Sequence, residues 1–527
     1  MQITGDLLIG AQVVRGRGGE VRAVNPATGE ALEHSFFGGD IEQVDQACTL
    51  ASAAFDSYRA TSLEARAQFL EAIAQGILDL GDELIERAIG ESGLTRPRLE
   101  GERARTCGQL RLFASIVRDG RWLNPVIDPA LPDRKPLPRP DLRSRKIPLG
   151  PVAVFGASNF PLAFSVAGGD TAAALAAGCP VIAKSHPSHL GTSELVGKVI
   201  QNAVAACGLP EGVFSLLVGD GNAVGEALVR HPAIQAVAFT GSRRGGLALV
   251  SIAAQRSNPI PVFAEMSSTN PVFLLPAALT QRGAAIATDL IASATLGVGQ
   301  FCTKPGIVIG IDSPELEQFS KDAATALESS TPGIMLNAGI HKAYLGGTQA
   351  LQANASAKQI GEGKPTTTSP CSAQAMLFST TAQAILTTPQ LTEEVFGPTT
   401  LLVACKNEAE MLAVAEHLEG QLTATLQLVD ADIPIASRLV PILERKAGRI
   451  LVNGFPTGVE VSHAMVHGGP FPSTSDSRAT SVGGMAIERF LRPICYQNFP
   501  ADLLPDAIKA DNPLSLWRLV DGKLQQP

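Results

Sequence analysis

The sequence predicts an α/β protein in which a parallel, doubly wound sheet forms the first large lobe. Three observations lead to this class. From Pro151 onward, short apolar runs typical of buried strands alternate with helical patterns. Most of these runs end in a glycine-rich or polar tip, as strand-to-helix turns do. The chain has 527 residues, of which 45% are hydrophobic and 17% charged, so it can bury the cores of two or three lobes.

The composition argues against several other classes of protein. Lys and Arg number 42 against 50 Asp and Glu, and the formal charge of −8 is spread along the chain, so we expect no nucleic-acid partner. Residues 147–183 carry a single charge, but prolines and glycines cut them into pieces too short for a membrane helix, so we expect no membrane partner. The eight cysteines include no CxxC pair, no His cluster has metal-ligand spacing, and no signal peptide is evident. We therefore expect reduced thiols, a cytoplasmic location and no metal site.

The first 130 residues contain patterns of helices that pack on a larger body. Residues 40–58 and 62–90 carry Ala and Leu at three- and four-residue spacing, and residues 100–118 continue the pattern with many arginines. Residues 127–148 are rich in proline and alternating charge, which predicts an extended arm instead of a helix.

Strands and helices alternate after this arm. We expect a parallel sheet with right-handed crossovers, whose ligands bind at the carboxyl ends of the strands. The expected strands are residues 152–155, 180–183, 213–218 and 236–239, and the expected helices are residues 162–177, 189–207 and 223–230. Strand-like runs at 271–275, 306–310, 399–404, 423–428 and 449–452 predict a second α/β lobe. Residues 489–500 could pair as an edge strand with the arm.

Polar or glycine-rich residues follow several of these strands. Asn159 lies between the first strand and its helix, where it could be only a helix cap. Lys184 ends the second strand beside a helix start, where phosphate-bearing ligands collect, although it could be only a solvated lysine. Glycine-rich turns at 219–225 and 240–245 would let the backbone approach a pyrophosphate, but neither turn has the GxGxxG spacing.

Two further residues could carry reactive groups. Glu265 follows an apolar strand, and a buried carboxylate in this position is either paired structurally or kept as a base. Cys302 lies in a short loop between apolar stretches, where a cysteine is most often a small hydrophobic residue. Neither residue decides the function alone.

The combination of motifs is far more specific than any single one. In order, the motifs are Asn159-Phe160-Pro161, Lys184, Thr240-Gly241-Ser242, Glu265, Gly299-Gln300-Phe301-Cys302 and Glu393-Glu394-Val395-Phe396-Gly397-Pro398. This set resembles the NAD(P)-dependent aldehyde dehydrogenase superfamily over roughly residues 20–500.

The resemblance implies the aldehyde dehydrogenase fold and its domains. We expect a Rossmann-like cofactor domain, an α/β catalytic domain and a small β oligomerisation flap, so that the chain forms a homo-dimer or homo-tetramer. The expected bounds are 1–129 and 149–263 for the cofactor domain, 264–470 for the catalytic domain, 130–148 and 485–502 for the flap, and 503–527 for a C-terminal tail to which we assign no role.

The resemblance also implies a mechanism. Cys302 would be the nucleophile that attacks the aldehyde and forms first a thiohemiacetal and then a thioester. The side-chain amide of Asn159 and the backbone N–H of Cys302 would stabilise the oxyanion, and such a donor is typically worth about 3 kcal/mol in the transition state. Glu265 would be the general base that activates water for hydrolysis.

The cofactor site follows from the same resemblance. Lys184 would bind the adenosine ribose, Ser242 the pyrophosphate and Glu394 the nicotinamide ribose. The other expected cofactor residues are Ser185, His186, Gly221, Gly225, Thr240, Gly241 and Phe396.

One departure from the family pattern bears on the cofactor. NAD-selective members usually have a glutamate three residues after the lysine, whereas this chain has Pro187. Without that carboxylate, a 2′-phosphate is not repelled and Lys184, with Ser185 or His186, can receive it. We therefore expect NADP as the cofactor, with NAD tolerated.

A second departure lies beside the expected base. Family members commonly have two glycines soon after the glutamate, whereas Ser267 and Ser268 follow here, so the path of Glu265 is less well defined.

Variant motifs point to one subfamily. Lys184-Ser185-His186-Pro187, Glu265-Met266-Ser267-Ser268 and His467-Gly468-Gly469-Pro470 are similar to those of the longer α-ketoglutaric semialdehyde (2,5-dioxovalerate) dehydrogenases of sugar-acid breakdown. That group oxidises 2,5-dioxopentanoate to 2-oxoglutarate. A substrate carboxylate requires a cation in the tunnel, and the expected substrate residues are Phe160, Arg103, Arg105 and Gln109. Arg103 and Arg105 point about 200° apart on a helix, so we expect one of them to face the site.

Two alternatives remain at this point. Relatives with similar motifs oxidise fatty or other aliphatic aldehydes, which makes an NADP-dependent aliphatic aldehyde dehydrogenase the nearer alternative. The other is a non-catalytic, cofactor-binding member of the fold, against which the joint presence of Cys302, Glu265 and Asn159 argues.

Overall fold

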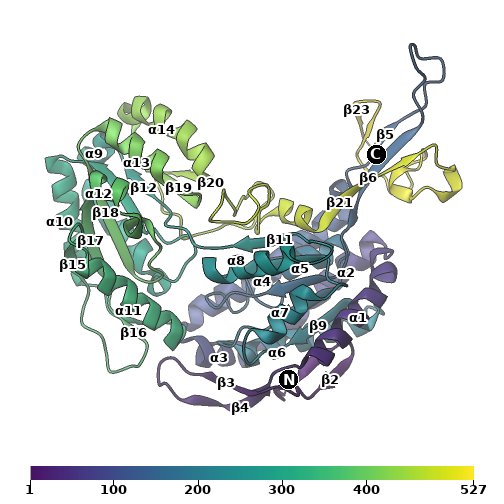
Figure 1. Ribbon diagram of the computed structural model, residues 1–527, viewed down its shortest axis with the longest axis horizontal. Coiled ribbons are helices and arrows are strands. Elements are labelled where there is room, and N and C mark those ends of the chain that lie inside the picture. Colours follow the sequence, from purple (N-terminus) through teal and green to yellow (C-terminus); the bar gives the residue numbers. More distant parts are fainter. Residues whose placement is uncertain (1, 527) are drawn as a thin grey trace.

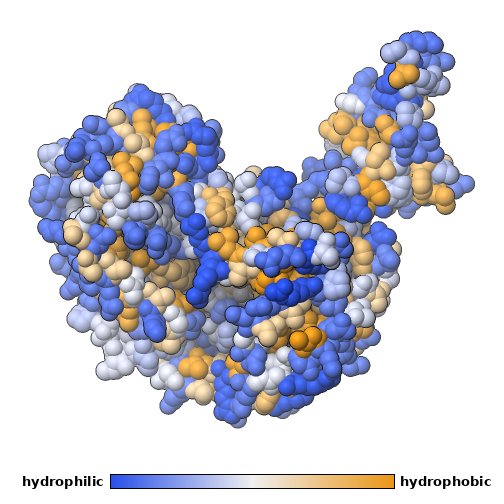
Figure 2. Space-filling model, viewed as in Figure 1, coloured by the Kyte–Doolittle hydropathy of each residue, from blue (hydrophilic) through white to orange (hydrophobic). Residues whose placement is uncertain are grey.

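The computed structural model describes residues 2–526 and confirms the α/β class. Within these residues it contains two seven-stranded sheets, one five-stranded sheet and two short ribbons. Figure 1 shows that the two large sheets form the cores of two lobes that face each other and that the five-stranded sheet projects away from them. Figure 2 shows that the surface is hollowed between the lobes.

The first lobe contains the predicted parallel sheet. The strand order is β11 (Val262–Glu265), β10 (Ala236–Thr240), β7 (Val152–Phe155), β8 (Val181–Lys184), β9 (Phe214–Leu217), β1 (Leu7–Ile9) and β2 (Gln12–Val14), of which only β1 and β2 are antiparallel. In β7, Val152 and Val154 enter one core cluster and Ala153 and Phe155 enter another, so both faces of the sheet are buried under helices. The doubly wound topology is confirmed.

The helices of this lobe mostly follow the predicted ranges. Residues 62–90 form two helices, because Gly81 adopts a left-handed φ of 55° between them. α1 begins at Asp40, which forms a capping box with Gln43. The helices are α1 (Ile41–Arg59), α2 (Leu63–Asp79), α3 (Gly81–Ser92), α4 (Arg96–Asp119), α5 (Gly169–Ala177), α6 (Leu190–Ala206), α7 (Ala223–Arg230) and α8 (Arg243–Ala254).

The helix predicted at 162–177 begins later, at Gly169. The backbone N–H groups of Leu162 and Ala163 donate to the buried Glu102 carboxylate at 2.8 and 2.9 Å. Since this side chain satisfies the donors, residues 161–168 form turns around it and no longer need helical hydrogen bonds. This difference matters because these turns follow Asn159 directly.

The sheet of the second lobe is formed by the five predicted strands and by two that were not predicted. The sheet order is β15 (Lys358–Glu362), β17 (Met376–Thr381), β18 (Thr399–Cys405), β13 (Ile307–Ile311), β12 (Val272–Leu274), β19 (Gln421–Gln427) and β20 (Ala447–Val452). Beside it, β14 (Gly333–Ile334) pairs with β16 (Ser372–Ala373), and in the first lobe β3 (Glu20–Val24) pairs with β4 (Ala31–Phe37). The helices are α9 (Pro276–Thr295), α10 (Pro314–Glu328), α11 (Ala338–Ala353), α12 (Ala382–Thr387), α13 (Glu408–His417) and α14 (Ile433–Lys446).

The third sheet brings the two ends of the expected flap together. β21 (Leu491–Gln497) pairs with β6 (Leu142–Pro148) over seven residues, which confirms the pairing of the proline-rich arm with the segment at 489–500. β5 (Val126–Asp128), β22 (Arg518–Val520) and β23 (Lys523–Gln525) complete the sheet, so residues after 503 extend it. Among the helices of residues 2–526, none is long and apolar enough to cross a membrane.

Candidate active site

Glu265 is the last residue of β11, which is an edge strand of the first sheet. A returning segment of the chain pairs with its free edge, since Ser475 N donates to Ala264 O at 3.0 Å and Met266 N donates to Ser473 O at 2.8 Å. Ser268, which stands where the family commonly has glycine, is accommodated because its hydroxyl donates to Gln421 Oε1 at 2.9 Å. The path of Glu265 is therefore fixed from both sides.

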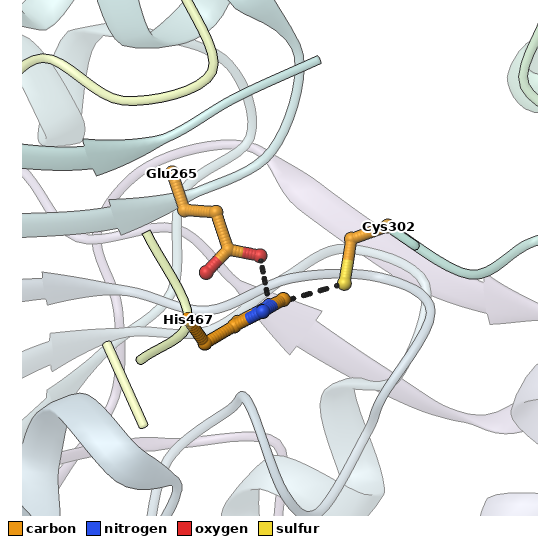
Figure 3. Close-up of side chains that lie close together, drawn as sticks. All are labelled: Glu265, Cys302 and His467. Carbon is orange, nitrogen blue, oxygen red and sulfur yellow. Dashed lines mark hydrogen bonds and ion pairs between the residues drawn. The ribbon is translucent and has the colours of Figure 1, made fainter. Parts of the chain in front are cut away.

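Three side chains from distant parts of the sequence meet at this strand end. Nε2 of His467 lies 2.8 Å from Oε1 of Glu265 and 3.3 Å from Sγ of Cys302. Figure 3 shows the imidazole between the carboxylate and the thiol. The hydroxyl of Ser481 donates to the second carboxylate oxygen of Glu265. The thiol, imidazole and carboxylate thus form one hydrogen-bonded group.

The protonation states of this group follow from its surroundings. Burial alone would raise the pKa of Glu265, but the hydrogen bonds and charge of His467 and the hydroxyl of Ser481 outweigh it, so the pKa is lowered and Glu265 is a carboxylate at neutral pH. Burial, followed by the negative charge of Glu265, raises the pKa of Cys302 well above its ordinary value, while Arg105 opposes this shift. The resting group therefore consists of a thiol and an ionised base.

The loop that carries Cys302 follows a tight turn. Gly297 and Gly299 adopt left-handed φ values of 56° and 64°, and Val298 between them has φ 59°, which is rare for a β-branched residue. A Cβ atom on Gly299 would lie 2.3 Å from the backbone of Gly397, so only glycine permits this approach. Nδ2 of Asn270 donates to the carbonyl of Cys302 at 2.8 Å and fixes the loop from the other side.

The approach of Gly397 to Gly299 also brings Glu394, the expected nicotinamide-ribose residue, near Cys302. Lys304 is buried, and its Nζ donates to the carbonyls of Thr399 at 2.6 Å and Val395 at 3.2 Å, which ties the Cys302 loop to the loop of Glu394 and Phe396. Burial raises the pKa of Glu394, and the charge of Lys304 opposes that shift. The carboxyl group of Glu394 therefore lies near Lys304 at the end of the site.

Asn159 lies beside the Cys302 loop. Its Nδ2 donates to the carbonyl of Gln300 at 2.9 Å, two residues before the thiol. The ring of Phe160 packs edge-to-face on Phe301, with 5.3 Å between centroids. The structure thus brings Asn159 and Phe160 against the loop that carries Cys302.

The predicted cofactor residues lie along the carboxyl edge of the first sheet. The stem of Lys184 passes over two glycines, since an added Cβ would lie 3.0 Å from its Cε at Gly219 and 3.7 Å from its Cδ at Gly225. Gly241 and Gly245 both pack against the ring of Phe239, where an added Cβ would lie 2.7 and 3.0 Å from Cζ. The turns after these strands therefore depend on glycine. A side chain at Gly219 would crowd Lys184, and one at Gly241 or Gly245 would crowd Phe239.

The start of α8 is suited to an anion. Ser242 is the N-cap, and its hydroxyl accepts the N–H of Gly245 at 3.2 Å, while Gly241 and Ser242 are exposed. Unpaired N–H groups and the helix dipole favour a phosphate in such a position. Thr240 and Glu265 are register partners in β10 and β11, so the predicted pyrophosphate and catalytic residues share one edge. This arrangement fits a dinucleotide.

His186 lies next to Lys184 on this edge. Burial, and then interaction with the neighbouring His189 and Lys184, lower the pKa of His186 well below its ordinary value, so the ring is neutral. Its Nδ1 accepts the N–H of Ser188 at 3.1 Å, which leaves the ring proton on Nε2. Ser185 has a buried hydroxyl without a hydrogen-bond partner among the described residues. These two groups can donate hydrogen bonds to a ligand held by Lys184.

The predicted substrate residues of α4 have different neighbours, and only some of them lie towards Cys302. Nη1 of Arg103 donates to the carbonyl of Gly81 at 2.7 Å, at the turn between α2 and α3. Arg105 lies over the ring of Phe164, and its Nη2 donates to the carbonyl of Val459 at 3.1 Å. Gln109 is buried against Gly169, at the start of α5. Arg105, and not Arg103, therefore joins the aromatic residues beside Cys302.

Several residues of the site were not predicted as such. His467 and Ser481 belong to residues 453–483, a long segment without helix or strand that returns from the second lobe to the first (Figure 1). No periodicity marks them, and the only signal was a histidine followed by Gly468 and Gly469. Asn270 and Lys304 are buried polar residues, and Nδ2 of Asn270 and Nζ of Lys304 donate to backbone carbonyls.

The thiol, imidazole and carboxylate could also hold a metal ion. The ligand atoms of Glu265, Cys302 and His467 all lie within 4.8 Å of one another, which is a suitable set for Zn²⁺. An ion bound there would occupy the thiol that covalent catalysis needs.

Comparison with known proteins agrees with this geometry. The model of the Aldehyde dehydrogenase family matches residues 13–491. The chain is 60% identical over 526 residues to α-ketoglutaric semialdehyde dehydrogenase 2 of Azospirillum brasilense, with all of both chains covered. It is 50% identical to α-ketoglutaric semialdehyde dehydrogenase of Acinetobacter baylyi, with 99% of each chain covered.

Solved structures show the same fold. The crystal structure of lactaldehyde dehydrogenase from Escherichia coli superposes with a TM-score of 0.82 at 21% identity, over 94% of this chain and 99% of that one. The aldehyde dehydrogenase fold is therefore confirmed. By its sequence and its fold, this chain belongs to the aldehyde dehydrogenase family and is an NAD(P)-dependent oxidoreductase that acts on aldehydes.

Proposed function

We propose that the chain oxidises 2,5-dioxopentanoate to 2-oxoglutarate with NADP, through a covalent intermediate on Cys302. One observation carries the mechanism: a half-buried thiol and a buried carboxylate both lie within hydrogen-bond distance of His467 Nε2. The substrate is supported by the two relatives with 60% and 50% identity, whose names state this semialdehyde.

The first half of the reaction forms the thioester. Cys302 loses its proton to the hydrogen-bonded pair of His467 and the ionised Glu265, and Sγ bonds to the aldehyde carbon while the carbonyl electrons move to oxygen. Asn159 Nδ2 and the backbone N–H of Cys302 stabilise this oxyanion. The oxidised nicotinamide, when bound, supplies the acceptor for the hydrogen and electron pair that leave the thiohemiacetal carbon.

The second half hydrolyses the thioester. Glu265 removes a proton from water, the water oxygen bonds to the acyl carbon, and the bond from that carbon to Sγ breaks. In the resting state His467 and Ser481 occupy both oxygens of Glu265. These donors keep the carboxylate ionised until a water molecule reaches it.

The substrate proposal predicts a clear preference among aldehydes. We expect kcat/KM for 2,5-dioxopentanoate to exceed that for hexanal by on the order of 100-fold, because a desolvated ion pair with the carboxylate contributes 2 kcal/mol or more. A steady-state panel of both aldehydes measures this ratio. A preference for hexanal would instead support the aliphatic aldehyde dehydrogenase.

The cofactor proposal rests on the residues around Lys184. No carboxylate occupies position 187, and Lys184, Ser185 and the Nε2 proton of His186 are the donors available to a 2′-phosphate. We expect kcat/KM for NADP to exceed that for NAD by about tenfold, the effect of roughly one additional charged hydrogen bond. Steady-state kinetics with both cofactors checks this, and a strong preference for NAD would contradict it.

We further propose that the protein is a cytoplasmic homo-oligomer with the expected domain bounds. All eight cysteines are free, as in a reducing compartment. The five-stranded sheet projects from the body (Figure 1), and its strands and connecting segments carry exposed apolar side chains, among them Leu137, Leu503 and Leu524. An exposed apolar projection of this kind is suited to contact with a second copy of the chain.

A further inference from the structure

Two arginines from opposite lobes reach one loop beside the active site. Arg105 lies on α4 of the first lobe and donates from Nη2 to the carbonyl of Val459 at 3.1 Å. Arg449 lies on β20 of the second lobe and donates to the carbonyls of Gly458 at 2.8 Å and Pro456 at 2.7 Å. Since the two carbonyls at 458 and 459 are adjacent, both guanidinium groups lie at the same short stretch of chain.

Neither guanidinium has an acidic partner within ion-pair distance among residues 2–526. Nη1 of Arg105 and Nε of Arg449 are shielded from solvent and have no hydrogen-bond partner there. The acids nearest to Arg105 are engaged elsewhere: Glu102 pairs with Arg98 at 3.1 Å, and the exposed Glu460 accepts the N–H of Val461 at 3.1 Å. Partly buried cations without an ion-pair partner are costly, so these two residues favour an anionic ligand.

An apolar surface connects Arg105 to the nucleophile. Phe160, Phe164 and Phe301 form an aromatic cluster, with 5.1 Å between the centroids of Phe160 and Phe164 and 5.3 Å between those of Phe160 and Phe301. Arg105 lies over Phe164, at 5.2 Å from the ring centroid. Phe301 is the neighbour of Cys302 in the chain. A ligand that spans this cluster would have its reactive carbon at Cys302 and its far end at the guanidinium groups.

Electrostatics agrees with this placement. Burial lowers the pKa of both Arg105 and Arg449, and interaction with the thiolate form of Cys302 opposes that shift at each. Both arginines are thus close enough to the thiol for their charges to interact with it.

Building on the proposed function, we propose that Arg105 and Arg449 together bind the far carboxylate of the substrate, one from each lobe. The site would then select short aldehydo acids, with the aldehyde at Cys302, the aliphatic chain over the aromatic cluster and the carboxylate between the two guanidinium groups. Planar guanidinium groups are suited to carboxylates because they present paired N–H donors. Arg449 was not among the substrate residues expected from the sequence.

The test compares an acid with a neutral aldehyde of the same carbon number. The variants Arg105→Gln and Arg449→Gln, with Arg111→Gln as a control at an exposed position of α4, are assayed with 2,5-dioxopentanoate and with pentanal. We expect the ratio of the two kcat/KM values to fall at least 30-fold in each site variant, mainly through KM, and to stay at the wild-type value in Arg111→Gln.

The outcomes separate this inference from the proposed function. A wild-type enzyme without preference for the acid would overturn both. A wild-type preference that persists in the Arg105→Gln and Arg449→Gln variants would overturn only the role of the arginines. A parallel loss with both aldehydes, which leaves the ratio unchanged, would show a structural role and would also overturn the inference.

Discussion

Cys302→Ser is expected to abolish aldehyde oxidation while leaving the protein folded. A hydroxyl is a far weaker nucleophile than a thiolate, so we expect kcat to fall on the order of 10⁴-fold or more. The substitution is nearly isosteric and the side chain is only half-buried, so the melting temperature should stay close to that of the wild type. Formation of reduced cofactor, followed by absorbance, measures the loss.

The control is another cysteine of the same chain. Cys495 is exposed on β21, away from the catalytic group, and Cys495→Ser should retain wild-type kcat. If Cys302→Ser produced reduced cofactor at the wild-type rate, the covalent mechanism would be wrong.

Glu265→Gln is expected to separate the two halves of the reaction. The amide removes the negative charge that raises the pKa of Cys302, so this pKa should fall and the thiolate should form at lower pH. The first turnover can then proceed with solvent as the proton acceptor, whereas hydrolysis loses its base. We expect a burst of about one reduced cofactor per active site, followed by a steady-state rate on the order of 10²- to 10⁴-fold below that of the wild type.

Two further measurements examine this variant. The pH at which iodoacetamide modifies Cys302 at half its maximal rate should be lower in Glu265→Gln than in the wild type, as the sign of the pKa shift requires. Hydroxylamine cleaves thioesters without a base, so it should restore turnover of the variant. An unchanged steady-state rate would exclude Glu265 as the base.

Part of this arrangement could be predicted from the sequence because it depends on local patterns. The strands of the first sheet are continuous apolar runs bounded by glycine or proline, and β7, β10 and α7 lie where these patterns place them. β15 and β17 were not predicted, since Lys358–Glu362 and Met376–Thr381 mix polar and apolar residues and gain their strand structure from pairing with each other and with β18.

The catalytic group also contains residues that local patterns predict and residues that only long-range contacts place. Asn159 and Glu265 follow predictable strands, and the order of motifs drew attention to Cys302. His467 lies 165 residues beyond Cys302, in a segment whose path is set by pairing with β11 and not by its own periodicity. The late start of α5 has a similar cause, because Glu102 from a distant helix captures the donors of Leu162 and Ala163. Such long-range contacts leave no local signal in the chain.

The arginines of α4 show what helical spacing can predict about a substrate site and what it cannot. Their angular separation indicates that Arg103 and Arg105 face different neighbours, and the structure shows which one lies beside Phe164. Helical spacing could not indicate Arg449, because that residue approaches from another lobe.

The most direct test of covalent catalysis is to trap the intermediate. Glu265→Gln would be mixed with NADP and 2,5-dioxopentanoate, quenched in acid after the burst, digested and examined by mass spectrometry. We predict that the peptide containing Cys302 carries the added mass of the acyl group, in a molar amount close to that of the burst, and that hydroxylamine removes it. An unmodified Cys302 despite a full burst, or an acyl group on another cysteine, would contradict the assignment of Cys302 as the nucleophile.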